Sequence, residues 1–90
     1  MREKESKQQN RQAGKQAVEA AEGVLQEYDE DDDLVRIKTN DGHTLSFQVV
    51  PRPKCDVNGV TDYQRLDDKC RGKYVELAFN TDGHVSEITD

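Results

Sequence analysis

The chain has 90 residues, of which 32% are hydrophobic and 36% are charged, and its formal net charge at pH 7 is −6. A chain of this length forms one domain at most, and no apolar run reaches the roughly 18 residues that a membrane-spanning helix needs. Residues 24–90 carry eight Lys/Arg and fifteen Asp/Glu, a net of −7, so this part repels phosphate backbones and anionic membranes. We therefore expect no membrane span and no general affinity for nucleic acid.

The first 23 residues are polar and differ from the rest in composition. Val18 is their only branched aliphatic residue. Residues 1–12 have no apolar stripe, which predicts disorder, whereas residues 13–22 consist mostly of helix formers and predict a helix. Gly23 is placed to end this helix. The sequence thus predicts a polar N-terminal arm, disordered and then helical, followed by a β domain over residues 24–90.

Alternating apolar and polar residues predict the strands of this domain. The five candidates are Val24–Tyr28, Leu34–Thr39, His43–Val50, Tyr74–Asn80 and His84–Thr89. The side chains expected to face the core are Val35, Ile37, Leu45, Phe47, Val49, Val75, Leu77 and Phe79. In the last strand Val85 and Ile88 break the alternation, which indicates a bulge. Asn40-Asp41-Gly42 and Thr81-Asp82-Gly83 have the composition of tight hairpin turns.

The segment between the third and fourth strands is rich in turn formers. Pro51 and Pro53 lack backbone N–H donors and are predicted to end the sheet. Residues 61–70 are predicted to form a short helix with Thr61 as its N-cap and with Leu66 and Tyr63 facing inward. The chain would then return to the sheet for the last two strands.

Three consecutive strands, a helical connection and a final hairpin thus follow one another over residues 24–90. This order resembles that of small bacterial β-barrel proteins of the OB-fold kind, and Gly72 just before the strand that starts at Tyr74 adds to the likeness. The resemblance implies a mainly β, five-stranded Greek-key barrel that binds its partner on the outer face of the second and third strands and on the flanking loops. An SH3-like barrel is the alternative fold.

The outward residues of the second and third strands form the first candidate binding face. They are Arg36, Lys38, Thr44, Ser46 and Gln48. A protein that binds single-stranded nucleic acid has stacking aromatic side chains and a basic groove on such a face. This face has two cations, Arg36 and Lys38, but no aromatic residue, and it lies beside an acidic loop. The face therefore favours a protein partner, with single-stranded nucleic acid as the alternative.

An acidic run is the second candidate recognition surface. It consists of Asp29, Glu30, Asp31, Asp32 and Asp33. The run does not match a calcium loop, which has Gly at its sixth position and Glu at its twelfth. Adjacent carboxylates repel each other and favour solvent, so an exposed loop between the first two strands is the simplest interpretation. The alternative is recognition of a basic target, as by an acidic inhibitor or mimic carried by a phage or plasmid.

The two cysteines, Cys55 and Cys70, flank a 14-residue segment. Closing this segment with a disulfide would stabilise the fold by about 3 kcal/mol, so a disulfide is predicted, with two free thiols as the alternative. A zinc site would need His43 and His84 as well, which follow separate Asp-Gly turns, and no metal site is predicted. A disulfide favours an oxidising compartment. We therefore expect a periplasmic or secreted protein whose signal peptide has been removed, with the cytoplasm as the alternative.

No set of residues has the spacing of catalytic machinery. Ser46 and Ser86 lack the G-x-S-x-G setting of a nucleophile, and no Gly-rich phosphate loop occurs. A barrel of this size is filled by its own side chains. We therefore predict no catalytic residue and no cofactor. The sequence indicates a non-catalytic interaction module for a protein partner.

Overall fold

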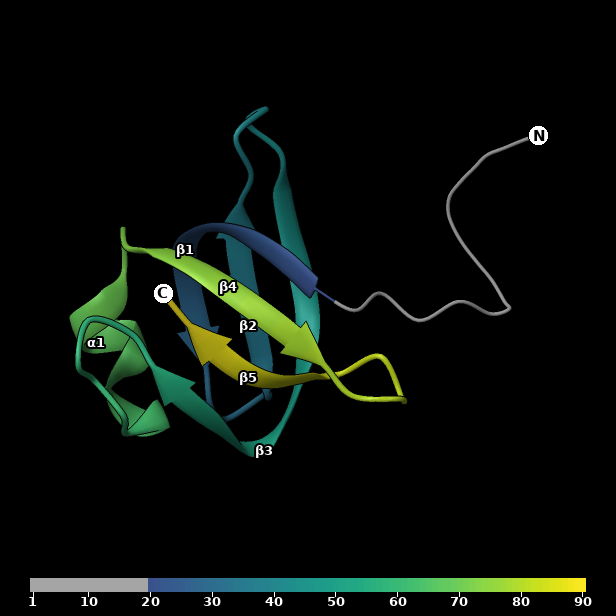
Figure 1. Cartoon of the computed structure of the whole chain (residues 1–90), viewed down its shortest axis with the longest axis vertical. Helices are drawn as coiled ribbons and strands as arrows, with labels where there is room; N and C mark the ends of the chain where they lie inside the picture. Colours follow the sequence, from purple (N-terminus) through teal and green to yellow (C-terminus); the bar gives the residue numbers. More distant parts are fainter. Residues whose placement is uncertain (1–19) are drawn as a thin grey trace.

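The structure is a computed structural model that describes residues 20–90 (Figure 1). The elements are β1 (Ala20–Asp29), β2 (Leu34–Lys38), β3 (Thr44–Asp56), a 3-10 turn (Tyr63–Arg65), α1 (Leu66–Cys70), β4 (Tyr74–Phe79) and β5 (Val85–Thr89). The expected mainly β fold with five strands and one short helix is confirmed. The prediction of disorder over residues 1–12, and that of a helix over residues 13–19, lie outside the described residues.

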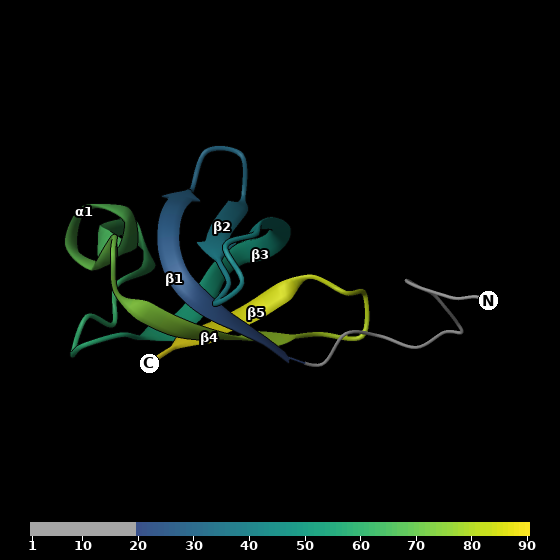
Figure 2. The ribbon, with the colours of Figure 1, turned by 90° about the horizontal axis from the view of Figure 1, so that it is seen from above.

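The five strands form one sheet that closes on itself. Their order is β1-β2-β3-β5-β4, and β1 also pairs with β4. Neighbouring strands are antiparallel, except that β3 and β5 run parallel. β1 serves two neighbours in turn, because residues 20–24 pair with β4 and residues 24–29 pair with β2. Figure 2 shows the long curve of β1 that this change of partner requires.

The start of β1 corrects the expected helix, since residues 20–22 belong to a strand. Ala21 pairs with Leu77, and Gly23 pairs with Val75. The helix propensity of Ala-Ala-Glu is overridden here by pairing with a strand far along the sequence. A Cβ atom at Gly23 would lie 2.6 Å from the carbonyl oxygen of Lys38. Gly23 therefore allows the close approach of β1 to β2 and does not end a helix.

β3 continues through Pro51 and Pro53, so the prediction that these residues end the sheet is wrong. The pairing of β3 with β5 shifts register between Val49 and Lys54, and both prolines lie in the interval. Arg52 stands between them with a φ of 58°. Prolines are tolerated at such a bulge because no ladder hydrogen bond is lost there. The bulge lets one strand pair first with β2 and then with β5.

The core contains buried side chains from every strand and from the connection between β3 and β4. They are Leu25, Tyr28, Val35, Ile37, Val49, Cys55, Val57, Leu66, Cys70, Val75, Leu77, Val85 and Ile88. The inward prediction is confirmed for the three valines and for Ile37 and Leu77. Phe47 and Phe79 also pack against the core but are only partly buried, whereas Leu45 is exposed, which corrects one of the predicted core positions.

The helical connection packs against the core beside β1. Leu66 is fully buried, as predicted, and Tyr63 is partly buried with its ring 6.5 Å from that of Tyr28. The N-cap is Asp62, not the predicted Thr61, because the Asp62 carboxylate accepts a hydrogen bond of 3.0 Å from the backbone N–H of Gln64. The connection thus supplies core side chains as well as surface.

The two predicted hairpin turns have the same geometry. The backbone N–H of Thr39 donates to the carbonyl of His43 at 2.8 Å, and Asn80 donates to His84 at the same distance. The predicted bulge in the last strand is also confirmed, since Ala78 pairs with Glu87 while Phe79 pairs with Val85. Both turns are therefore closed by the same kind of backbone hydrogen bond.

Candidate functional site

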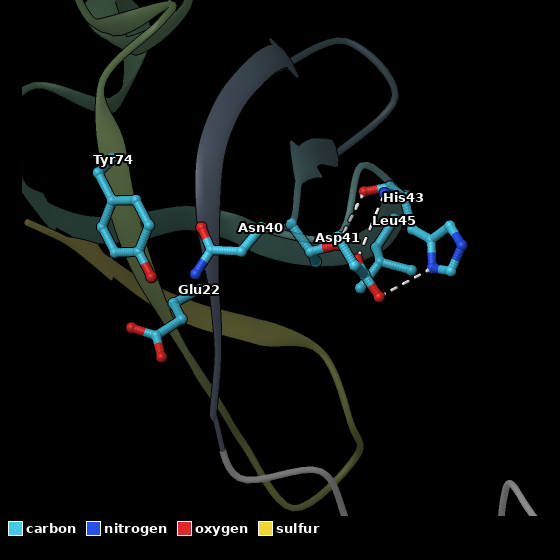
Figure 3. Close-up of a pocket in the computed structure, with 7 residues that line it drawn as sticks. Glu22, Asn40, Asp41, His43, Leu45 and Tyr74 are labelled. Carbon is cyan, nitrogen blue, oxygen red and sulfur yellow. Dashed lines mark hydrogen bonds and ion pairs between the residues drawn. The ribbon is translucent and has the colours of Figure 1, made fainter.

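A hollow of about 400 Å³ lies between the β2–β3 hairpin and the strands β1 and β4 (Figure 3). It is lined by Glu22, Thr39, Asn40, Asp41, His43, Leu45 and Tyr74. We call it the Leu45–Tyr74 hollow. Leu45 is 39% exposed and Tyr74 is 43% exposed, and they are the two exposed large hydrophobic side chains of the described residues. Such side chains gathered in one concavity are typical of a binding surface.

The closure of the sheet explains why Leu45 and Tyr74 meet. Leu45 pairs with the buried Ile37, so it has the inward orientation that the sequence predicted. It lies near the hairpin end of β3, beyond the side chains that cover the core, and therefore remains exposed. Tyr74 begins β4 and pairs with Val24 of β1. The two residues reach the same hollow from strands that are not neighbours in the sheet.

Carboxylates stand at the margin of this hollow. The interaction of the Tyr74 hydroxyl with the Glu22 carboxylate raises the pKa of Tyr74. Asp41 accepts a hydrogen bond from the Thr39 hydroxyl, which holds the pKa of Asp41 below its ordinary value. His43 Nδ1 lies 3.2 Å from Asp41 Oδ2. Glu22 and Asp41 therefore give an apolar hollow an acidic rim.

The polar face predicted from the sequence is brought together by the strand register. Arg36 pairs with Ser46, Lys38 with Thr44, and Leu34 with Gln48. The Arg36 cation is held by partners on both sides, since Nη1 lies 2.6 Å from Glu27 Oε1 and Nε donates to Ser46 Oγ at 3.2 Å. Part of the positive charge on this face is therefore neutralised within the protein.

The acidic run forms the turn between β1 and β2, as the sequence predicted. Asp29 Oδ1 accepts hydrogen bonds from the backbone N–H groups of Asp31 (3.0 Å) and Asp32 (3.2 Å), and Asp33 has a φ of 52°. The turn meets the helical connection around a second hollow of about 400 Å³. Its acidic lining is Glu27, Asp29, Glu30, Asp31, Asp67 and Asp68. Sequence reasoning missed the last two, because their approach depends on the packing of α1.

The cysteines are free thiols, so the predicted disulfide is wrong. Both are buried within the core. Cys70 Sγ lies 3.7 Å from the carbonyl oxygen of Val57, and burial raises the pKa of both thiols. The segment between the cysteines is held by packing of Val57 and Leu66 rather than by a covalent bond. The disulfide argument for an oxidising compartment therefore falls away.

The histidines occupy separate hairpins. His43 follows the β2–β3 turn and His84 follows the β4–β5 turn, and Figure 1 shows these two hairpins pointing in different directions. Within residues 20–90 no three or more His, Cys, Asp or Glu side chains are grouped as a metal site. The Leu45–Tyr74 hollow includes His43 alone of the two.

Three surfaces are thus defined by the part of the chain that the structure describes: the Leu45–Tyr74 hollow, the polar face of β2 and β3, and the acidic hollow. No helix among residues 20–90 is long and apolar enough to cross a membrane. Comparison of the chain with protein-family models, with curated proteins and with solved structures gives no match.

Proposed function

We propose that residues 20–90 form a barrel of the OB-fold kind. The parallel pairing of β3 with β5, the helix between β3 and β4, and the pairing of β1 with both β2 and β4 support this assignment over an SH3-like barrel. The bulge at Arg52 adds support, because it bends β3 so that it serves both β2 and β5. Small barrels of this kind act as binding modules.

We further propose that the protein is a non-catalytic module that binds another protein through the Leu45–Tyr74 hollow. The observation that carries this proposal is the position of Leu45 and Tyr74, the two exposed large hydrophobic side chains of the described part, in one hollow. A buried aromatic or aliphatic contact at the centre of a patch supplies most of the affinity in protein interfaces. The hollow offers that contact.

Nucleic acid fits these residues less well. Residues 20–90 carry eight Lys/Arg and sixteen Asp/Glu, a net of −8, and a phosphate backbone approaching this surface is repelled. Base stacking needs several exposed rings along a groove, whereas among residues 20–90 Tyr74 is the one exposed aromatic side chain. A protein partner is favoured on both counts. Recognition of a basic target by the acidic run, as an inhibitor or mimic, stays a prediction.

A selection of random peptides displayed against the full chain tests the proposal. We expect the enriched peptides to lose about tenfold or more in affinity when Leu45→Ser removes the apolar contact. Gln48→Ala is the matched control, because Gln48 is exposed on the same strand but does not line the hollow. Affinity is measured by fluorescence anisotropy of the labelled peptides.

The same measurement with labelled oligothymidine separates the alternatives. Peptide binding that is weakened by Leu45→Ser, together with no binding of the oligothymidine, supports the proposal. Equal peptide affinity for wild type and Leu45→Ser would place the interface elsewhere and overturn it. Salt-dependent binding of the oligothymidine with no enriched peptide would favour the nucleic-acid alternative instead.

A further inference from the structure

We infer that the Leu45–Tyr74 hollow takes an apolar side chain from a positively charged protein segment, with a Lys or Arg next to the apolar residue in that segment. This inference rests on the proposed function and specifies the partner. It follows from the combination of apolar lining and acidic rim in one place.

The lining determines which part of the partner enters. Leu45 contributes an aliphatic surface on one side and Tyr74 an aromatic ring on the other, and both are substantially exposed (Figure 3). A volume of about 400 Å³ accommodates a large apolar side chain together with its backbone. Covering these side chains removes apolar area from water, which favours association.

The rim determines the charge of the neighbouring residues. Asp41 accepts a hydrogen bond from the Thr39 hydroxyl, which holds the pKa of Asp41 below its ordinary value, and Glu22 lines the hollow together with Tyr74. Each carboxylate retains further oxygen lone pairs that can accept from an incoming ammonium or guanidinium group. His43 also stands at the rim, but its ring lies against Asp41. A cation on the partner, one residue from the apolar side chain, is therefore placed near a carboxylate.

The charge of the whole protein supports the same partner. The described residues carry a net of −8, which attracts a basic segment and accelerates its encounter with this surface. A second copy of the chain, with its own net charge of −6, is repelled for the same reason. The charge therefore favours a basic partner over self-association through this hollow.

Synthetic peptides that differ only in charge and in the apolar residue test the inference on the ¹⁵N-labelled full chain. The cores are Lys-Leu-Lys, Ser-Leu-Ser, Lys-Ser-Lys and Glu-Leu-Glu. We expect Lys-Leu-Lys to shift the amide signals of His43, Leu45 and Tyr74 and to bind about fivefold more tightly than Ser-Leu-Ser. The paired substitution Glu22→Gln with Asp41→Asn should abolish that difference, and added salt should reduce it.

The four peptides compare charges on the wild-type protein. The test therefore does not depend on whether the paired variant folds. Equal binding of Lys-Leu-Lys and Ser-Leu-Ser at the hollow would overturn the inference but leave the proposed function standing. Stronger binding of Glu-Leu-Glu would overturn it as well. If Lys-Leu-Lys and Lys-Ser-Lys shift only the amides of residues 29–33, the cation acts at the acidic run, and the inference fails. If no peptide shifts the amide signals of the residues that line the hollow, the inference is also wrong. The peptide selection then tests the proposed function separately.

Discussion

At the scale of single residues, Asp67 joins α1 to the sheet. Its Oδ1 accepts a hydrogen bond of 2.9 Å from the backbone N–H of Tyr28 and another of 3.0 Å from Arg71 Nε. Its Oδ2 accepts from Arg71 Nη2 at 2.7 Å. The hydrogen bonds from Arg71 are the largest cause that holds the pKa of Asp67 below its ordinary value, followed by that from Tyr28. A lowered pKa in the folded state means that the ionised carboxylate stabilises the fold.

The pH dependence of stability tests this role. The contribution of Asp67 is complete above the ordinary carboxyl pKa of about 3.9 and is lost as the pH falls through the lower pKa of the folded state. Asp67→Asn should therefore lower the free energy of unfolding by about 1–2 kcal/mol at pH 7, with a smaller loss below pH 3. Urea unfolding across this range measures it, with the exposed neighbour variant Asp68→Asn as control. A loss that does not change with pH would contradict the assignment.

Gly23 provides a second test at this scale. Its missing Cβ leaves room for the Lys38 carbonyl, whose oxygen would lie 2.6 Å away from an added carbon. Gly23→Ala should therefore force β1 and β2 apart and reduce stability by about 1–3 kcal/mol. Gly72→Ala is the matched control, since nothing lies within 4 Å of its added Cβ and only its φ of 85° opposes alanine. Equal losses in urea unfolding would show that the close approach carries no special weight.

At the scale of elements, the sequence predicts strands better than it predicts their ends. β2 and β4 agree with the alternation to within a residue, because their period of two is interrupted by clear turns. The start of β1 is missed because Ala20 and Ala21 have helical propensity, and only their pairing with β4 makes them a strand. The length of β3 is missed because Pro53 reads as a stop unless the bulge is known.

A contact between elements provides the next prediction. The rings of Phe47 and Phe79 pack edge to face with centroids 5.0 Å apart and an interplanar angle of 76°. The pair links β3 to β4, which are not neighbours in the sheet. A double-mutant cycle with Phe47→Leu and Phe79→Leu should show a coupling of about 0.5–1.5 kcal/mol in the free energy of unfolding. Additive losses would indicate that the two rings act independently.

At the scale of the whole molecule, the candidate site depends on closure of the sheet. The polar face could be predicted, because Arg36 and Ser46 lie on adjacent strands with a simple register. The Leu45–Tyr74 hollow could not, since Leu45 has the pattern of a core residue and Tyr74 lies far from it in the sequence. Leu45 and Tyr74 are exposed because of how the β2–β3 hairpin is placed beside β1 and β4 in the closed sheet. No local pattern contains that information.

The buried thiols report on global unfolding. Cys55 and Cys70 belong to the core, and burial raises the pKa of each thiol, which lowers the fraction of reactive thiolate. The unreduced native protein should therefore react slowly with a thiol reagent, and two thiols per chain should react after unfolding in urea. Titration of the unfolded chain that finds no thiol would restore the disulfide.

The double pairing of β1 has a consequence for the order in which the protein folds. β1, β2 and β3 meet through short turns, whereas the contact of Ala20 with Ala78 joins segments from opposite ends of the described chain. Loop-closure entropy makes the distant contact slow to form, and it is the natural place for the native sheet to open. Glu22 of β1, Leu45 of β3 and Tyr74 of β4 all line the same hollow. A partner bound in this hollow contacts β1, β3 and β4 at once and holds β1 against β4. Binding should therefore slow the unfolding of the protein.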